Sequence, residues 1–292
     1  MKKGFTLIEL LVVIAIIGLL TSIVLISTRG GKDQAKYANY LQFDGQIKSY
    51  LGTDILGEWL FEESGDDTCS GGMDFCDTSG NNLHGENIGG VGRIPNTASP
   101  QLGKAGNFDR DTFVQVKSPF LGENEKLDKY TMTFWVSTGA NNYTWFALNA
   151  GASTPAHLFF YYSLSGEYTT SMAFITTTDI AGEENNHRIA CPLGSSFFKS
   201  NEWHFFGITY NGSKLAMYKD GQKCNEVDAT GKLKIINSPS QPSDTFLNIG
   251  TYVGNGVVGR IDQVRIYKQG LHSAQIEKMY VKDLFKIGLT SL

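Results

Sequence analysis

Charged residues and prolines are both scarce in this sequence. Only 18% of its 292 residues are charged, 25 basic side chains nearly balance 29 acidic ones, and 7 prolines stand against 33 glycines. This charge balance provides neither the basic surface that nucleic-acid binding requires nor an acidic interaction tail. Many glycines and aromatic residues with few charges indicate instead a β-rich chain with many tight turns.

The four cysteines form no C-x-x-C pair, which argues against zinc ribbons and thioredoxin-like redox sites. Their even number favours two disulfides in a domain outside the cytoplasm, because disulfides persist in oxidising compartments. Three pairings are possible, and buried free thiols are the alternative. Proximity in the sequence predicts the pairs Cys69–Cys76 and Cys191–Cys224.

The beginning of the chain is strongly apolar, with an almost unbroken run over residues 10–26. About 20 apolar residues can span a bilayer as a helix, and Lys2 and Lys3 before the run predict that its start stays in the cytoplasm. An ordinary secretory signal fits poorly, because no A-x-A-like cleavage site follows the run. A plain membrane anchor also fits poorly, because Glu9 would cost about 2.5–3.5 kcal/mol at the centre of a membrane helix.

Gly4 is followed by Phe5-Thr6-Leu7-Ile8-Glu9-Leu10-Leu11, which resembles the type III prepilin signal of type IV pilins and of type II secretion pseudopilins. The resemblance implies cleavage after Gly4 by prepilin peptidase and methylation of the amine of Phe5. In that family the acid at the position of Glu9 pairs with the N-terminal ammonium of a neighbouring subunit. Pairing removes the penalty of burying either charge alone. The expected partners are therefore other pilin subunits, prepilin peptidase and a membrane assembly platform of a pilus or secretion system.

The resemblance also divides the first part of the chain. Residues 1–4 are the expected leader peptide and residues 5–52 the pilin helix, with about 5–27 in the membrane. Apolar side chains at helical spacing between residues 37 and 51 indicate a stripe that needs a surface to pack on. In pilins that surface is the globular domain, and a free stalk is the alternative. We therefore expect insertion into the cytoplasmic membrane with the N-terminus inside, then display on an extracellular pilus or a periplasmic pseudopilus.

From residue 58 onward, short apolar or alternating runs are separated by Gly, Asn, Asp and Ser turns, as is typical of strands. Residues 130–136 alternate well. Asn211-Gly212 and Asp220-Gly221 predict hairpins, because these turn residues tolerate positive φ. No long amphipathic helical pattern interrupts the strands, so an antiparallel sandwich of two sheets is expected.

Several short pieces of this region occur in a fixed order: 57–63 with 77–82, 103–109, 202–222, 247–250, 259–267 and 271–276. Together they resemble the laminin G-like, or concanavalin A-like, jelly roll over residues 57–282, leaving 283–292 as a C-terminal tail. The expected fold class is thus a long transmembrane N-terminal helix followed by an all-β antiparallel sandwich.

Catalysis is not expected. Glycoside hydrolysis needs two carboxylates across the scissile bond, and the E-x-D-x-E run that typically supplies them in this fold does not occur. The five histidines are scattered, and neither H-x-x-x-H nor G-x-S-x-G is present.

Calcium is a candidate cofactor, because many laminin G-like domains bind it through oxygen ligands. The candidate ligands are Asp77 and Asn82 from the opening turn and Asp262 from the closing strand, since first and last strands of a sandwich can be neighbours. The alternative is that Asp77 makes an Asx turn and that Asp262 accepts hydrogen bonds from backbone donors.

Two segments have the exposed aromatic and polar composition that lectin-like sites need. The first, residues 139–145, contains Tyr143 and Trp145, for which core packing is the alternative. The second, residues 179–188, is interpreted as an acidic loop, for which a solvated surface loop without a ligand is the alternative. Its candidate ligand-binding residues are Asp179, Glu183, Asn185, Asn186 and His187.

These features indicate a modular minor pilin that displays a lectin-like domain, in or at the tip of a pilus, toward a glycan or protein ligand. A pseudopilin whose module contacts secreted cargo is the alternative.

Overall fold

The computed structural model of the chain divides into two units, residues Met1–Ser49 and Tyr50–Leu292. The described residues are 7–8, 10–18, 54–95, 103–117, 127–138, 143–150, 158–163, 171–180, 183–194, 197–199, 201–233, 245–250 and 257–286.

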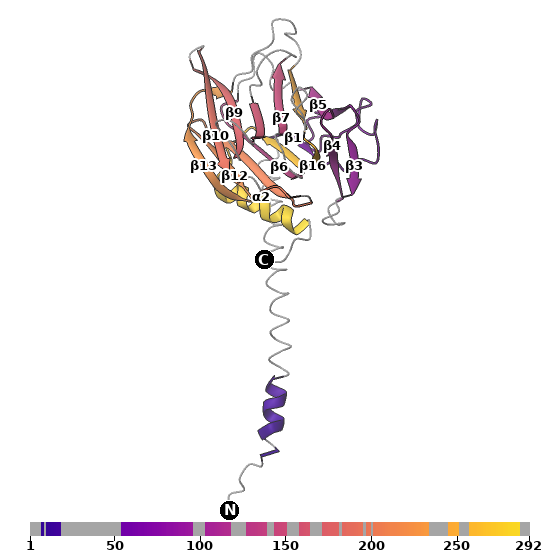
Figure 1. The fold of residues 1–292 in the computed structure, drawn as a ribbon, viewed down its shortest axis with the longest axis vertical. Coiled ribbons are helices and arrows are strands. Elements are labelled where there is room, and N and C mark those ends of the chain that lie inside the picture. The colour runs from indigo at the N-terminus through magenta and orange to yellow at the C-terminus, as the bar shows by residue number, and fades with distance from the viewer. Residues whose placement is uncertain are drawn as a thin grey trace, which may run out of the picture. The chain divides into compact units, whose positions relative to one another are not determined.

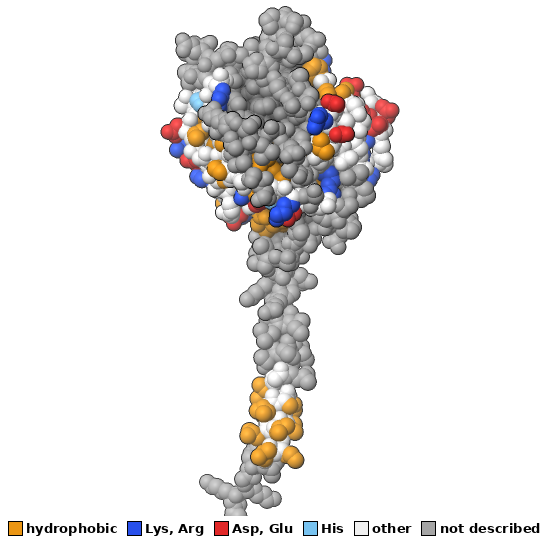
Figure 2. Space-filling view, viewed as in Figure 1, with side chains coloured by type: hydrophobic (Ala, Val, Ile, Leu, Met, Phe, Trp, Pro, Cys, Tyr) orange, Lys and Arg blue, Asp and Glu red, His pale blue; other side chains and the backbone are white. Residues whose placement is uncertain are grey.

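In the first unit, residues 7–8 and 10–18 are helical (Figure 1). Apolar side chains of this segment are exposed in the single chain (Figure 2): Leu7, Ile8, Leu10, Leu11, Val12, Val13, Ile14, Ile16 and Ile17. None of the helices in the part of the chain that the structure describes is long and apolar enough to cross a membrane. The rest of the predicted 5–52 helix, with Gly4, Phe5 and Glu9, lies outside the described residues.

The second unit is an antiparallel sandwich, as predicted (Figure 1). Within the described residues, the first sheet has the order β3 (Gly92–Pro95), β4 (Lys104–Phe108), β16 (Gly259–Tyr267), β6 (Tyr130–Thr138), β11 (His204–Tyr210), β12 (Lys214–Lys219), β13 (Gln222–Asp228), and β1 (Ile55–Trp59) also pairs with β16. The second has the order β2 (Gly85–Ile88), β5 (Phe113–Lys117), β15 (Thr245–Ile249), β7 (Tyr143–Ala150), β8 (Leu158–Ser163), β9 (Ser171–Ile180), β10 (Glu183–Pro192), with β14 (Lys232–Leu233) beside β9.

The core lies between the two sheets. Alternate residues of β6, among them Phe134, point into it. The ring of Phe134 meets that of Phe160 from β8 edge to face, with centroids 5.0 Å apart. Every residue of β6 is buried, so its outer face must be covered as well.

The helix α2 (Ser273–Lys286) covers that outer face (Figure 1). The ring of Tyr280 stacks on Trp135 of β6 at 5.6 Å, and Trp135 Nε1 donates to Asp283 at 3.0 Å. The predicted short terminal helix is therefore present but longer than expected. Asp283, the first residue of the predicted C-terminal tail, is buried within α2.

The two predicted hairpin turns differ in length. Asp220 and Gly221 form a two-residue connection with φ values of 48° and 77°, as predicted for the turn that matches strand twist. After Asn211-Gly212 the loop is one residue longer, because Asn211 Oδ1 accepts the N–H groups of Ser213 and Lys214.

Both predicted disulfides are confirmed. Cys69–Cys76 closes a short loop between β1 and β2. Cys191–Cys224 joins β10 to β13, the outermost strands of the two sheets on one side of the sandwich. Asn225 Nδ2 donates to Ala190 O beside it at 2.8 Å, so the two exposed edges are held together.

We expect the double variant Cys191→Ser/Cys224→Ser to lose about 3–4 kcal/mol of unfolding free energy, because this bridge closes the longer loop of the unfolded chain. Cys69→Ser/Cys76→Ser should lose about 2–3 kcal/mol. Urea unfolding of both variants measures the difference. A larger loss for the short loop would contradict this account.

Candidate functional site

The sandwich has two ends, which the strand registers of the first sheet define. At the proximal end, Asp54 O accepts the N–H of Lys268 at 2.8 Å, and Ile55 of β1 lies opposite Tyr267 of β16. At the distal end, Gly259 at the start of β16 lies opposite Thr138. Asp54, with which the described part of the second unit begins, therefore lies at the proximal end.

The second sheet follows the same division. The N–H of Val257 donates to Gly250 O at 2.8 Å, which places the end of β15 beside the distal start of β16. Ile249 of β15 lies opposite Phe146, so β7, with Tyr143 and Trp145, begins at the distal end. Conversely, Asp179 of β9 lies opposite Lys232 of β14, and Lys232 forms an ion pair with Asp128, just before the proximal start of β6.

The structure therefore separates the two predicted ligand segments. Tyr143 lies opposite Tyr162, and Tyr162 lies opposite Met172. From Met172 to Asp179 along β9 is roughly 23 Å, at about 3.3 Å per residue. One compact site cannot include both segments.

The prediction that residues 179–188 form a loop is wrong, because they belong mostly to the paired strands β9 and β10. Asn186 is exposed, and His187 Nε2 lies 3.0 Å from Thr230 O. The candidate side chains whose placement falls outside the described residues are Tyr143, Trp145, Asp179, Glu183 and Asn185.

Described side chains at the distal end form a cluster that the sequence did not reveal. The Arg260 guanidinium lies 5.3 Å from the ring centroid of Trp203 and donates to Asn201 Oδ1 at 2.7 Å. Burial lowers the pKa of Arg260. Val258 beside it is 41% exposed. Arg260 and Asn201 are 59 residues apart in the chain, so no local pattern could have predicted their contact.

A second distal group surrounds His204. Its Nδ1 lies 3.2 Å from Asp220 Oδ2, and its ring is 4.1 Å from that of Phe197. Lys219 Nζ lies over Phe197 at 4.9 Å. Because side chains flank this aromatic ring, the group packs the distal loops rather than offering a bare stacking surface.

The predicted calcium ligand Asp77 is fully engaged in hydrogen bonds. Its carboxylate accepts the backbone N–H groups of Glu58, Ser79 and Leu83 and the hydroxyl of Ser79, all at 2.8–3.0 Å. A carboxylate offers about four acceptor sites, so Asp77 would have to lose partners to bind an ion. Asn82 adopts φ 56° in the same turn. This geometry favours the Asx-turn alternative, and calcium binding stays a prediction.

Asp262 lies in a different environment. It is only 2% exposed, and Oδ1 accepts the N–H of Gln263 at 2.7 Å. Burial raises its pKa well above the usual value, and the carboxylates of Glu62 and Asp283 raise it further. The charged groups that act on Asp262 are therefore Glu62, Asp283 and Arg265, and the predicted co-ligands Asp77 and Asn82 are not among them.

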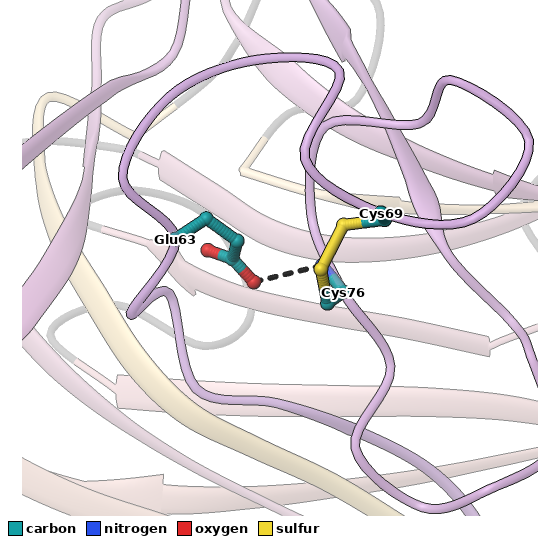
Figure 3. A group of neighbouring side chains, drawn as sticks. All are labelled: Glu63, Cys69 and Cys76. Carbon is teal, nitrogen blue, oxygen red and sulfur yellow. Dashed lines mark hydrogen bonds between the residues drawn. A yellow bond between two sulfur atoms is a disulfide. The ribbon is translucent and has the colours of Figure 1, made fainter.

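Glu63, Cys69 and Cys76 also lie close together (Figure 3). The two sulfur atoms are joined in a disulfide, so they are not available as thiolate ligands. Glu63 accepts the backbone N–H of Cys76 at 2.8 Å. The group is a structural support for the loop and not a metal site.

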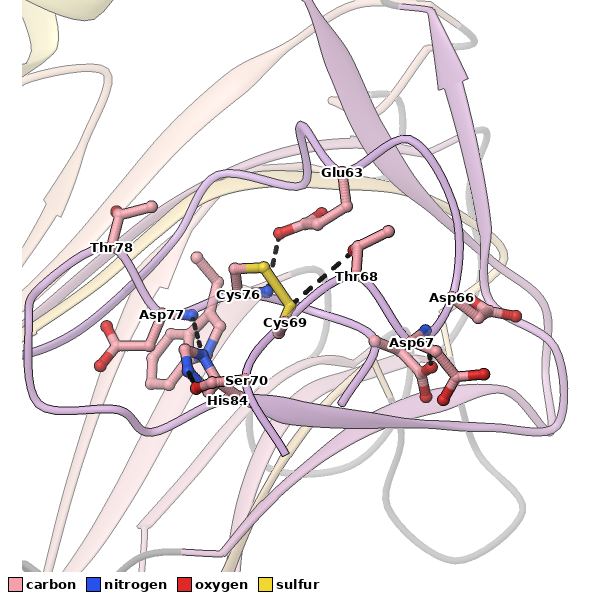
Figure 4. The surroundings of a disulfide bond; sticks show 12 residues. Glu63, Asp66, Asp67, Thr68, Cys69, Ser70, Cys76, Asp77, Thr78 and His84 are labelled. Carbon is pink, nitrogen blue, oxygen red and sulfur yellow. Dashed lines mark hydrogen bonds between the residues drawn. A yellow bond between two sulfur atoms is a disulfide. The ribbon is translucent and has the colours of Figure 1, made fainter. Parts of the chain in front are cut away.

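Ser70 and His84 form a pair that resembles a nucleophile and its base (Figure 4), with Ser70 Oγ 2.7 Å from His84 Nε2. However, His84 Nδ1 accepts the backbone N–H of Asp77 at 3.0 Å. In a neutral ring the proton therefore lies on Nε2, which donates to Ser70. A base must accept the serine proton there, so this pair holds the loop and is not poised for catalysis.

Comparison with protein families assigns both parts of the chain. Residues 1–25 match the prokaryotic N-terminal methylation motif. Residues 109–277, more than half of the chain, match the concanavalin A-like lectin/glucanases superfamily. The chain belongs to this superfamily. Strands β1 and β4 lie before the matched residues yet pair with β16, so the superfamily sandwich in this protein begins at Ile55. No curated protein sequence matches.

Solved structures confirm the fold. The binding domain of Paraclostridial mosquitocidal protein 1 is 17% identical, with a TM-score of 0.55 over 79% of this chain and 52% of that one. The binding domain of botulinum neurotoxin DC is 14% identical, with a TM-score of 0.54 over 80% and 52%. This chain thus spans about half the length of these toxin domains. Domain 4 of AbnA, an extracellular arabinanase from Geobacillus stearothermophilus, is 14% identical, with a TM-score of 0.51 over 78% and 98%.

The raised pKa of Asp262 makes stability depend on pH. An unfolded Asp ionises near pH 4, about its ordinary pKa, whereas folded Asp262 stays protonated to higher pH. The contribution of Asp262 to the free energy of unfolding is therefore fully present below about pH 4. It is lost as pH rises toward the pKa of folded Asp262, by up to about 1.4 kcal/mol per pH unit. We expect Asp262→Asn to be more stable than the wild type at pH 7, with the gap closing toward pH 4 in urea unfolding.

The same variant tests calcium. A cation at Asp262 would raise the Tm of the wild type and not that of Asp262→Asn, and EDTA would reverse the rise. A stability gap independent of pH, in the absence of calcium, would contradict the account of a buried protonated carboxyl.

Proposed function

We propose that the protein is a modular minor type IV pilin whose sandwich binds a glycan through its distal end. The observation that carries this proposal is the presence, in one chain, of an N-terminal methylation motif at residues 1–25 and a lectin-superfamily sandwich. The motif supports membrane insertion, processing by prepilin peptidase and assembly with other pilins. The sandwich supports recognition of an extracellular ligand.

Similar structures support a carbohydrate ligand and leave a protein ligand as the alternative. The botulinum neurotoxin DC domain was solved in complex with SialylT, and Domain 4 of AbnA with arabinotriose. The botulinum neurotoxin DC domain was also solved in complex with rat synaptotagmin II. The absence of an E-x-D-x-E run from the sequence favours binding over hydrolysis.

The position of Asp54 supports the distal end, and not the proximal one, as the proposed ligand surface. A ligand surface beside the tether would be hindered by the filament, whereas the distal end faces away from the residue at which the chain leaves the sandwich. Of the two predicted segments, only the one with Tyr143 and Trp145 begins there.

Binding of the detergent-solubilised full-length protein to a glycan array, with and without calcium, tests this proposal. We expect saturable binding that Tyr143→Ala and Trp145→Ala each weaken at least about tenfold, because stacked aromatics dominate such sites. The matched proximal variants Glu183→Gln and Asn185→Ala should bind normally. Loss of binding in the proximal variants alone would place the site at the other end, and no binding to any glycan would contradict the proposal.

Assembly is tested separately through Glu9. We expect Glu9→Ala to be processed but to enter filaments poorly, because the N-terminal ammonium of the neighbouring subunit would lack its buried partner. Immunogold labelling of sheared filaments measures incorporation, with Ser22→Ala as the control in the same apolar run. Normal incorporation of Glu9→Ala would refute the pairing role, and labelling confined to the periplasm would favour the pseudopilin alternative.

A further inference from the structure

The strand β1 is short, yet both of its edges and its side chains are tied to the rest of the sandwich. We infer that β1 is a tension-bearing anchor, built to transmit force between the filament and the distal ligand surface. This inference rests on the proposed function, because tension requires a filament at one end and a bound ligand at the other.

One edge of β1 is held by β16. Glu58 lies opposite Arg265, and Trp59 lies opposite Val264. The strand β16 is itself paired on its other side with β6, so β1 is attached next to the middle of the sheet and not at a loose edge.

The other edge of β1 is held by residues 77–83. The N–H of Thr78 donates to Glu58 O at 2.9 Å, and the N–H of Glu58 donates to Asp77 Oδ1 at 2.9 Å. Asn81 Nδ2 donates to Ile55 O at 2.7 Å. The disulfide Cys69–Cys76 ends directly before Asp77, so a crosslinked loop supports this second edge.

Two side chains of β1 also bind residues in the rest of the sandwich. Trp59 is fully buried, and its Nε1 donates to Leu83 O at 2.9 Å. Glu58 Oε1 lies 2.8 Å from Arg265 Nε, and Arg265 Nη1 lies 2.8 Å from Asp283 of α2. At the point where the chain enters, the Asp54 carboxylate also accepts a hydrogen bond from Gln269 Nε2.

The direction of the load decides how these bonds respond. Antiparallel ladder bonds are perpendicular to the strands. A pull at Asp54 away from the distal end acts along β1, so its ladder bonds to β16 are loaded together in shear. A pull at the C-terminus loads α2 first, which is held by side-chain contacts and can peel from the sheet one turn at a time.

Single-molecule force spectroscopy on the full-length protein tests the anchor. One geometry places handles at the N-terminus and at exposed Asp111 in the distal turn between β4 and β5, and the other at the two termini. We expect a clearly higher rupture force in the first geometry. Glu58→Gln should raise its rupture rate at constant force about tenfold, because it removes a charge-assisted hydrogen bond that must break before β1 leaves.

Glu226→Gln is the matched control, since it removes an ion-paired carboxylate on β13, away from β1. It should leave the rupture rate unchanged. Equal rupture forces in the two geometries would overturn the inference even if Glu58→Gln did not fold, and so would equal effects of the two substitutions. The measurement uses no ligand, so a failed anchor and a failed glycan proposal are separate outcomes.

Discussion

Arg265 joins three parts of the sandwich that lie far apart in the sequence. Its guanidinium contacts Glu58 on the first strand and Asp283 on the last helix, each at 2.8 Å. Burial opposes the charge of Arg265, but these two carboxylates outweigh it and raise its pKa. Breaking a buried pair by removing one partner typically costs about 3–5 kcal/mol, because the remaining charge has no compensation. The start and the end of the module therefore fold as one structure.

The pairing of the first strand with the last also sets the end of the sandwich at which Asp54 lies. Because β1 pairs with the last strand, Asp54 is fixed at the proximal end, beside the connection from β16 to α2. Because the strands are antiparallel, turns lie at both ends of the sandwich, and those at residues 109–112 and 220–221 lie at the distal end. The proposed ligand surface at the distal end is thus separated from Asp54 by the length of the sandwich, which is the arrangement that a displayed binding module needs.

Features set by neighbouring residues were predictable from the sequence. Asp220-Gly221 specifies its own turn, and the pairing of Cys69 with Cys76 follows from their proximity. The register between distant strands was not predictable. Residues 179–188 lie mostly on β9 and on β10, the last strand of its sheet in the described residues, and a polar composition alone does not distinguish such a strand from a loop. The separation of Tyr143 from Asp179 depends on pairings of β7, β8 and β9 that no local pattern encodes.

The two aspartates that the sequence grouped as calcium ligands show why residue type alone is a poor guide to chemistry. Asp77 accepts hydrogen bonds from three backbone N–H groups and one hydroxyl, so its negative charge is already compensated where β1 meets the opening turn. Asp262 is buried with one backbone donor and faces Glu62 and Asp283. With these partners, Asp77 helps to hold β1 in place. The charge of Asp262 has less compensation, because burial, Glu62 and Asp283 raise its pKa more than the Gln263 N–H and Arg265 lower it. Of the two aspartates, Asp262 is therefore the one that a bound cation would stabilise more.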